Sequence, residues 1–154
     1  MNRMLVIGIG SLIMTDDGIG ARVAGTIQGM LQEQGITVLI GETDVQYCLD
    51  AIKPDDFLVI IDAMMQGTEP GSIEIIPLQD VMKSHGKLYS QHDCSLLEAV
   101  SMNYTEIRGN LIGIEVADIK FGFNLSDVLE LRLNNICEKV FNRIVKMKEV
   151  GERA

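Results

Sequence analysis

Short apolar runs alternate with amphipathic stretches along the chain. Four continuous runs are typical of strands buried on both faces of a sheet; they are residues 4–7, 37–40, 57–61 and 111–114. Residues 72–77 alternate weakly and predict a further strand at an edge. Three stretches repeat apolar residues every three or four positions, as helices do; they are residues 17–34, 96–102 and 127–148. The pattern predicts an α/β fold, a three-layer sandwich whose mostly parallel, twisted sheet of about five strands is flanked by helices.

Polar residues mark the ends of the predicted helices. Asp16 or Asp17 offers a carboxylate cap at the start of the first helix, and Gly35 can end that helix. Ser126 is suited to cap the last helix. Since one cap needs only one carboxylate, the second of the two adjacent aspartates is available to face a ligand cleft.

Composition indicates one folded, globular domain. The chain has 154 residues, which suit a single domain over residues 1–154. Hydrophobic residues make up 47% and charged residues 23%, whereas a disordered chain would be far poorer in apolar residues. No apolar run approaches the ~20 residues that cross a bilayer, so no membrane partner is expected. Residues 1–10 fit a buried strand and not a signal peptide.

Charge and cysteine content exclude several classes of partner and site. Thirteen Lys and Arg stand against 22 Asp and Glu, a formal charge of -9, and no basic run offsets it. Nucleic acid is therefore not an expected partner. Three widely spaced cysteines, Cys48, Cys94 and Cys137, exclude a disulfide framework and a Cys-x-x-Cys metal site. We expect a cytoplasmic protein with buried, inert thiols.

A glycine-rich segment follows the first strand, where ligands of α/β sheets bind. Gly8 and Gly10 match the first two positions of a dinucleotide fingerprint, but Ile13 stands where the third glycine belongs. Asp16 and Asp17 would also repel a pyrophosphate at the start of the helix. The segment disfavours a nucleotide site.

Two more chemical groups are expected near the same edge of the sheet. Asp62 ends the run 57–61, and His92 comes directly before a predicted helix. Together with Asp17 they would form a site of two carboxylates and one imidazole, which suits a borderline divalent metal and leaves coordination positions open. The alternatives are an Asp62 that bonds nearby backbone amides and a structural His92. His85 lies in a polar stretch and is given no role.

Nucleophilic catalysis is the competing chemistry. Ser95, His92 and Asp62 supply the residue types of a catalytic triad, but the chain has no G-x-S-x-G elbow. Cys94 is next to His92, yet side chains of sequence neighbours usually point apart. The sequence therefore disfavours both a serine and a cysteine nucleophile.

These motifs resemble the [NiFe]-hydrogenase maturation endopeptidases over nearly the whole chain. The resemblance rests on Gly8-x-Gly10-Ser11-(x)4-Asp16-Asp17-Gly18-x-Gly20, on Asp62-Ala63, on His92 and on Gly113-Ile114-Glu115. It implies a cytosolic endopeptidase that acts on the precursor of a hydrogenase large subunit after nickel insertion and removes a short carboxyl-terminal extension. The resemblance also implies that the nickel is carried by the substrate precursor and that other divalent metals could substitute in the isolated protein.

The resemblance also assigns roles to residues. By position, the residues that would recognise the nickel and also serve as the catalytic group are Asp17, Asp62 and His92. No separate nucleophile is assigned. These three side chains should then converge, and replacing any of them by Ala should leave folding nearly intact. The chain departs from the family at Ile40-Gly41-Glu42-Thr43, where an Asp-Gly-Gly-Thr/Ser run is common. The alternative function is a non-catalytic α/β module that binds a metal or small ligand.

Overall fold

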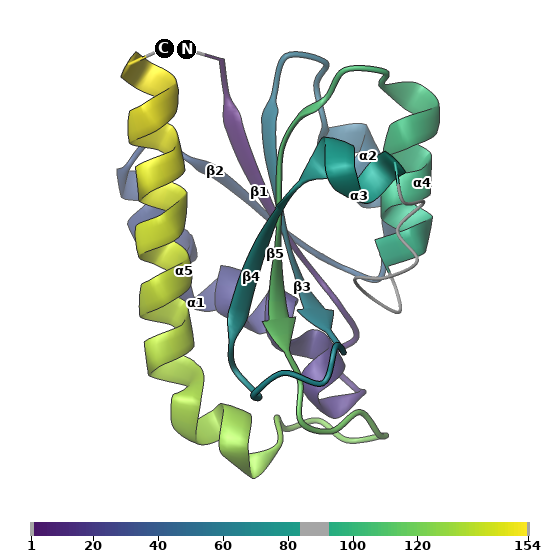
Figure 1. The fold of residues 1–154 in the computed structure, drawn as a ribbon, viewed down its shortest axis with the longest axis vertical. Helices are drawn as coiled ribbons and strands as arrows, with labels where there is room; N and C mark the ends of the chain where they lie inside the picture. Colours follow the sequence, from purple (N-terminus) through teal and green to yellow (C-terminus); the bar gives the residue numbers. More distant parts are fainter. Residues whose placement is uncertain (1, 84–92, 154) are drawn as a thin grey trace.

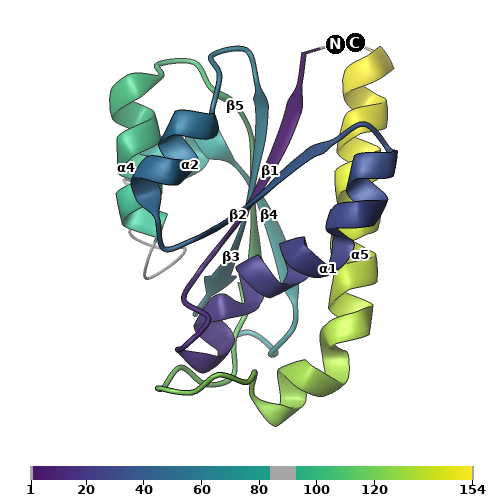
Figure 2. The same ribbon diagram turned by 180° about the vertical axis from the view of Figure 1, so that it is seen from behind.

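The computed structural model describes residues 2–83 and 93–153 and shows a twisted five-stranded sheet between two layers of helices (Figures 1 and 2). The strands are β1 Met4–Ile9, β2 Thr37–Glu42, β3 Phe57–Met64, β4 Ile73–Pro77 and β5 Arg108–Glu115. Their order is β2-β1-β3-β5-β4, and only β4, at an edge, runs antiparallel to its neighbour. The predicted fold class and the edge position of the strand at 72–77 are confirmed.

Helices cover the two faces of the sheet unequally. One face carries α1 (Ile19–Glu33) and α5 (Asp127–Arg153), whereas the other carries α2 (Val45–Ala51), α3 (Leu78–Lys83) and α4 (Asp93–Asn103) (Figure 1). A single 3-10 turn, η1 (Thr15–Gly18), joins β1 to α1. η1 thus follows the carboxyl end of β1 and contacts β3.

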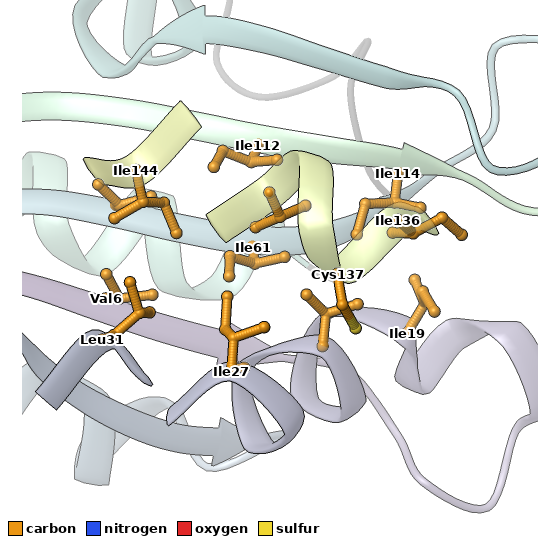
Figure 3. Close-up of a cluster of buried hydrophobic side chains, with 14 of the residues drawn as sticks. Val6, Ile19, Ile27, Leu31, Ile61, Ile112, Ile114, Ile136, Cys137 and Ile144 are labelled. Carbon is orange, nitrogen blue, oxygen red and sulfur yellow. The ribbon is translucent and has the colours of Figure 1, made fainter. Parts of the chain in front are cut away.

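The core forms because successive residues of each strand point to opposite faces. On β3, Ile61 faces α1 and α5, while its neighbour Ile60 faces the other layer. Figure 3 shows Ile61 on the same side of the sheet as Ile27 of α1 and Cys137 of α5, which belong to the same buried cluster. Ile27, Ile60 and Ile61 are fully buried, and each such side chain contributes about 1.5–3 kcal/mol. This packing fixes the strands whose ends carry the candidate chemistry.

Several predicted element ends are confirmed and others are wrong. Gly35, with a φ of +76°, follows the end of α1 as expected. Ser126 caps α5, because its Oγ accepts a hydrogen bond from the Leu129 backbone N–H at 3.4 Å. The predicted aspartate cap of α1 is wrong: the N-cap is Gly18, and no side chain caps this helix.

Other bounds also differ from the prediction. β3 does not stop before Asp62 but continues to Met64, because residues 62–64 pair with residues 113–115 of β5. The helices α2 and α3 escape periodicity analysis because they have only 7 and 6 residues. At α2 the sequence does carry a signal in Asp44, whose Oδ1 accepts a hydrogen bond from the Tyr47 backbone N–H at 3.0 Å.

Candidate functional site

The candidate site lies where β1 and β3 end against η1 and the start of α1. If Gly20 carried a Cβ, that atom would lie 2.2 Å from the carbonyl oxygen of Ile61 and 2.6 Å from that of Ile9. At Gly10, whose φ is +129°, a Cβ would lie 2.0 Å from the carbonyl oxygen of Asp17. The glycines of this motif therefore let backbones approach each other closely. Gly20 lets the start of α1 approach β1 and β3, and Gly10 lets the end of β1 approach η1, which explains both glycines without a bound phosphate.

Asp17 lies on η1, which contacts β3, and Asp62 lies on β3 near its carboxyl end. Both side chains are buried, with exposed fractions of 1% and 0%. Oδ2 of Asp17 accepts a hydrogen bond from the Ser11 backbone N–H at 2.9 Å. Oδ1 of Asp62 accepts one from the Ala63 backbone N–H at 2.7 Å. The structure thus brings these two predicted residues to one edge of the sheet, and Asp62 also makes the local amide contact that we considered as its alternative role.

The adjacent Asp16 has a different role. Its carboxylate accepts hydrogen bonds from the backbone N–H groups of Ala117, Asp118 and Ser126 at 3.0, 3.0 and 2.7 Å, and from the Ser126 hydroxyl at 2.7 Å. Thr15 extends the same network, since its hydroxyl donates to the Asp118 carbonyl at 2.8 Å. Asp16 therefore fastens the loop between β5 and α5, whereas its neighbour Asp17 accepts a hydrogen bond from Ser11 instead.

Glu115 ends β5 at the same edge of the sheet, and the sequence pattern alone assigned it no role. It is 3% exposed, and its carboxylate accepts hydrogen bonds from the Gln66 backbone N–H at 2.9 Å and the Thr68 hydroxyl at 2.9 Å. The Gly67 backbone N–H donates to it at 3.3 Å. Glu115 thus holds the loop that follows Asp62. The only available signal was its position at the end of an apolar run, in the Gly113-Ile114-Glu115 segment.

The third predicted ligand, His92, lies outside the described residues, and so does the control His85. The side chains of Cys94 and Ser95 are not described either. The prediction that neither is a catalytic nucleophile therefore stays a prediction. Within residues 2–83 and 93–153, no three or more His, Cys, Asp or Glu side chains are grouped to hold a metal ion. The convergence of Asp17, Asp62 and His92 accordingly remains a prediction.

A small cavity of about 120 Å³ lies beside the end of β1. Gly10 and Glu42 contribute to its lining, together with Leu96 from the first turns of α4. The start of α4 is therefore at the same edge of the sheet as Asp17. Cys48 also lines this cavity, but burial, and then the negative charge of Asp44, raise the pKa of its thiol to about 11. Cys48 is an unreactive thiol at neutral pH.

Burial likewise raises the pKa of the Cys137 thiol. Cys48 and Cys137 are both free and buried, which confirms the expectation of inert thiols for these two.

Glu42 stands at the rim of this cavity in an unusual backbone conformation. Its φ is +50°, in the left-handed region that favours glycine. Its carbonyl oxygen accepts a hydrogen bond from the Gly10 backbone N–H at 2.8 Å, next to a register shift between β1 and β2. Glu42 thus has the backbone conformation that a glycine, which is common at this position in hydrogenase maturation endopeptidases, would adopt without strain. The exposed Glu42 side chain adds a negative charge to the rim.

Fold and site define an α/β protein with buried acidic side chains at the carboxyl edge of a mostly parallel sheet. The family model of HycI, hydrogenase maturation protease, matches residues 21–143. The chain belongs to the hydrogenase maturation protease family.

Individual relatives agree with this assignment. The hydrogenase expression/formation protein HupD of Rhizobium leguminosarum bv. viciae is 30% identical over 77% of this chain and 61% of its own length. The chain thus spans about three fifths of that relative. The hydrogenase 2 maturation protease of Escherichia coli is 24% identical over 99% of this chain and 94% of its own length.

Solved structures share the fold. The hydrogenase maturating endopeptidase HybD from Escherichia coli has a TM-score of 0.76 at 23% identity and covers 95% of this chain and 94% of its own. The [NiFe] hydrogenase maturation protease HybD from Thermococcus kodakarensis has a TM-score of 0.74 at 22% identity, with 92% and 98% covered. Among the helices of the described residues, none is long and apolar enough to cross a membrane.

Proposed function

We propose that this protein is an endopeptidase that removes the carboxyl-terminal extension from the nickel-loaded precursor of a [NiFe]-hydrogenase large subunit. The observation that carries the proposal is the pair of buried carboxylates, Asp17 and Asp62, at one edge of the sheet in a chain of this family. The reaction belongs in the cytoplasm, where free thiols such as Cys48 and Cys137 stay reduced.

The chemistry of the two carboxylates supports the recognition of a cation. Ionised carboxylates are costly to bury, and a nearby positive charge offsets that cost. With an imidazole from His92, they form the oxygen and nitrogen donor set that borderline divalent metals accept. The start of α4 lies at the same edge, so the residue that precedes this helix is a reasonable third ligand. The nickel would arrive in the substrate, already held by the precursor's thiolates.

This arrangement supplies a means of discrimination. A loaded precursor presents a nickel ion that Asp17, Asp62 and His92 can coordinate, whereas an empty precursor offers these side chains no metal and gains no such bonds. The same carboxylates offer two routes to hydrolysis. They can hold the substrate's nickel beside the scissile bond, as in a metal-dependent peptidase, or take a proton from the attacking water, as in an aspartyl-type peptidase.

Incubation of the purified protein with its precursor, followed by mass spectrometry, tests the proposal. We expect the nickel-loaded precursor to be shortened and the nickel-free precursor to stay intact. Asp17→Asn, Asp62→Asn and His92→Gln should each lower the rate by at least about a hundredfold, as for loss of one metal-binding or catalytic group. His85→Ala is the matched control and should cleave at the wild-type rate.

A non-catalytic binding module is the alternative. If neither precursor is shortened although the loaded one binds, the endopeptidase proposal is wrong. Calorimetry with Ni²⁺ and Zn²⁺ on the isolated protein should show only weak binding that Asp62→Asn abolishes, because three protein ligands leave the coordination shell open.

A further inference from the structure

A groove of about 740 Å³ lies at the opposite edge of the sheet from Asp17 and Asp62. Its floor includes Phe57 and Arg108, which begin β3 and β5 and are paired in register. Asp62 is five residues further along β3, a separation of roughly 16 Å at ~3.3 Å per residue. The groove is therefore a separate feature of the fold and has no part in the proposed proteolysis.

One wall of the groove is a single face of α5. Arg143, Lys146, Met147 and Val150 line it at helical spacings of three and four. The floor belongs to the sheet face that α5 otherwise covers, and it includes Ile75 of β4, which pairs with Ile112 of β5. The groove thus lies between the last turns of α5 and the first residues of β3 and β5.

The charge of the groove is opposite to that of the molecule. The chain has a net charge of -9, yet Arg108, Arg143 and Lys146 line the groove and no Asp or Glu of the described residues does. None of these three cations forms an ion pair within residues 2–83 and 93–153. Lys146 lies seven residues before the end of α5 and Arg108 begins a strand, so the helix dipole, which acts within the last turn, explains neither cation.

The remaining lining adds a hydrogen-bond donor and apolar surface. Among the described residues, the partner of Asn110 Nδ2 is the sulfur of Met147, at 3.5 Å. Because thioether sulfur is a weak acceptor, an anionic oxygen would replace it readily. Phe57, Ile75 and Met147 are partly buried and offer an apolar surface against which a ring or chain can pack.

We propose that this groove, which we call the α5 groove, binds a small organic anion that combines a phosphate or carboxylate group with an apolar body. Arg108, Arg143 and Lys146 bind the anionic group, the Asn110 amide donates to it, and Phe57 and Ile75 contact the body. The volume is within the range of small-molecule sites. Guanidinium groups are suited to both anions because they donate two parallel hydrogen bonds.

Phenyl phosphate is the test ligand, and amide shifts in NMR spectra of the purified, untagged protein are the measurement. We expect saturable shifts at Arg108, Asn110 and Met147 with a dissociation constant on the order of millimolar, as for a fragment of this size. Arg108→Gln and Arg143→Gln should each weaken binding by about tenfold, and added salt should weaken it too. Lys139→Gln, which removes an exposed cation of α5 outside the groove, is the matched control.

Two further ligands separate the contributions. Inorganic phosphate, which lacks the apolar body, and phenol, which lacks the charge, should both bind at least about fivefold more weakly than phenyl phosphate. Equal binding of phenol, equal binding of inorganic phosphate, or unchanged affinity in both arginine variants would overturn the proposal. An absence of saturable shifts would do so as well. None of these measurements uses proteolysis, so their outcome is independent of the proposed function.

Discussion

The carboxylate of Asp16 accepts two hydrogen bonds from Ser126, a residue 110 positions further along the chain. The backbone N–H and the hydroxyl of Ser126 both donate at 2.7 Å. Ser126 in turn accepts from the Leu129 backbone N–H and caps α5, which begins at Asp127. The start of the last helix is thus positioned by a residue beside the candidate site.

Asp16→Asn should destabilise the fold strongly. An amide oxygen cannot accept all the bonds that the carboxylate accepts, and the buried donors it abandons cost about 1–3 kcal/mol each. We expect a loss of about 2–4 kcal/mol in the free energy of unfolding, and of about 1 kcal/mol in Ser126→Ala. Urea denaturation measures both. Asp118→Asn alters a carboxylate whose described ion pair is an exposed one with Lys120, and is the control; a loss as large there would contradict the prediction.

The neighbouring Asp17 should behave in the opposite way. Asp17→Asn and Asp62→Asn keep an oxygen that can accept the hydrogen bond from Ser11 or Ala63. We therefore expect the free energy of unfolding to change by less than about 1 kcal/mol in either variant, while precursor cleavage is lost. Denaturation and cleavage are measured on the same preparations. A variant that unfolds as readily as Asp16→Asn would show that its aspartate is structural.

The backbone at Glu42 offers a third test. Its φ of +50° costs a non-glycine residue about 1 kcal/mol. Glu42→Gly should raise the free energy of unfolding by up to about 1 kcal/mol, because glycine accepts this conformation at no steric cost. Glu42→Ala removes the same charge but keeps the Cβ, so thermal unfolding of the two variants isolates the backbone effect. Equal midpoints would contradict it.

The buried thiol of Cys48 should make the protein sensitive to alkali. Its pKa rises from 9.0 to about 11 in the fold, so between these values the unfolded chain has lost a proton that the folded chain retains. This contribution to stability is complete below pH 9 and is lost as the pH rises toward 11, up to about 2–3 kcal/mol. Denaturation at pH 8 and pH 10.5 measures the slope. Cys48→Ala should have a shallower slope whatever its absolute stability, and an unchanged slope would refute the assignment.

The sequence predicted the sheet well because its strands are buried on both faces and consist of unbroken apolar residues. It missed α2, in which Cys48 is the only fully buried residue of a seven-residue helix. Such an element has too few core contacts to impose a periodic pattern.

The candidate site was predictable only in part, for a related reason. Asp16 and Asp17 are adjacent and chemically identical, and what distinguishes them is the loop of residues 117–126, far away in the sequence. Glu115 was not predicted as a loop anchor because its partners, Gln66 and Thr68, follow a different strand. Local patterns place residues at the carboxyl edge of the sheet, but the division of labour among them depends on tertiary contacts.

The length of α5 has a practical consequence for handling the protein. Its 27 residues carry the chain over ~40 Å, from Ser126 at the carboxyl edge to the far side of the sheet, where Gly151 and Asn2 line the same groove. Both ends of the fold thus leave from one place, remote from Asp17 and Asp62. Immobilisation through either end presents the acidic edge to solution, and a short peptide linker between the ends would permit circular permutants that open the chain at an exposed turn elsewhere.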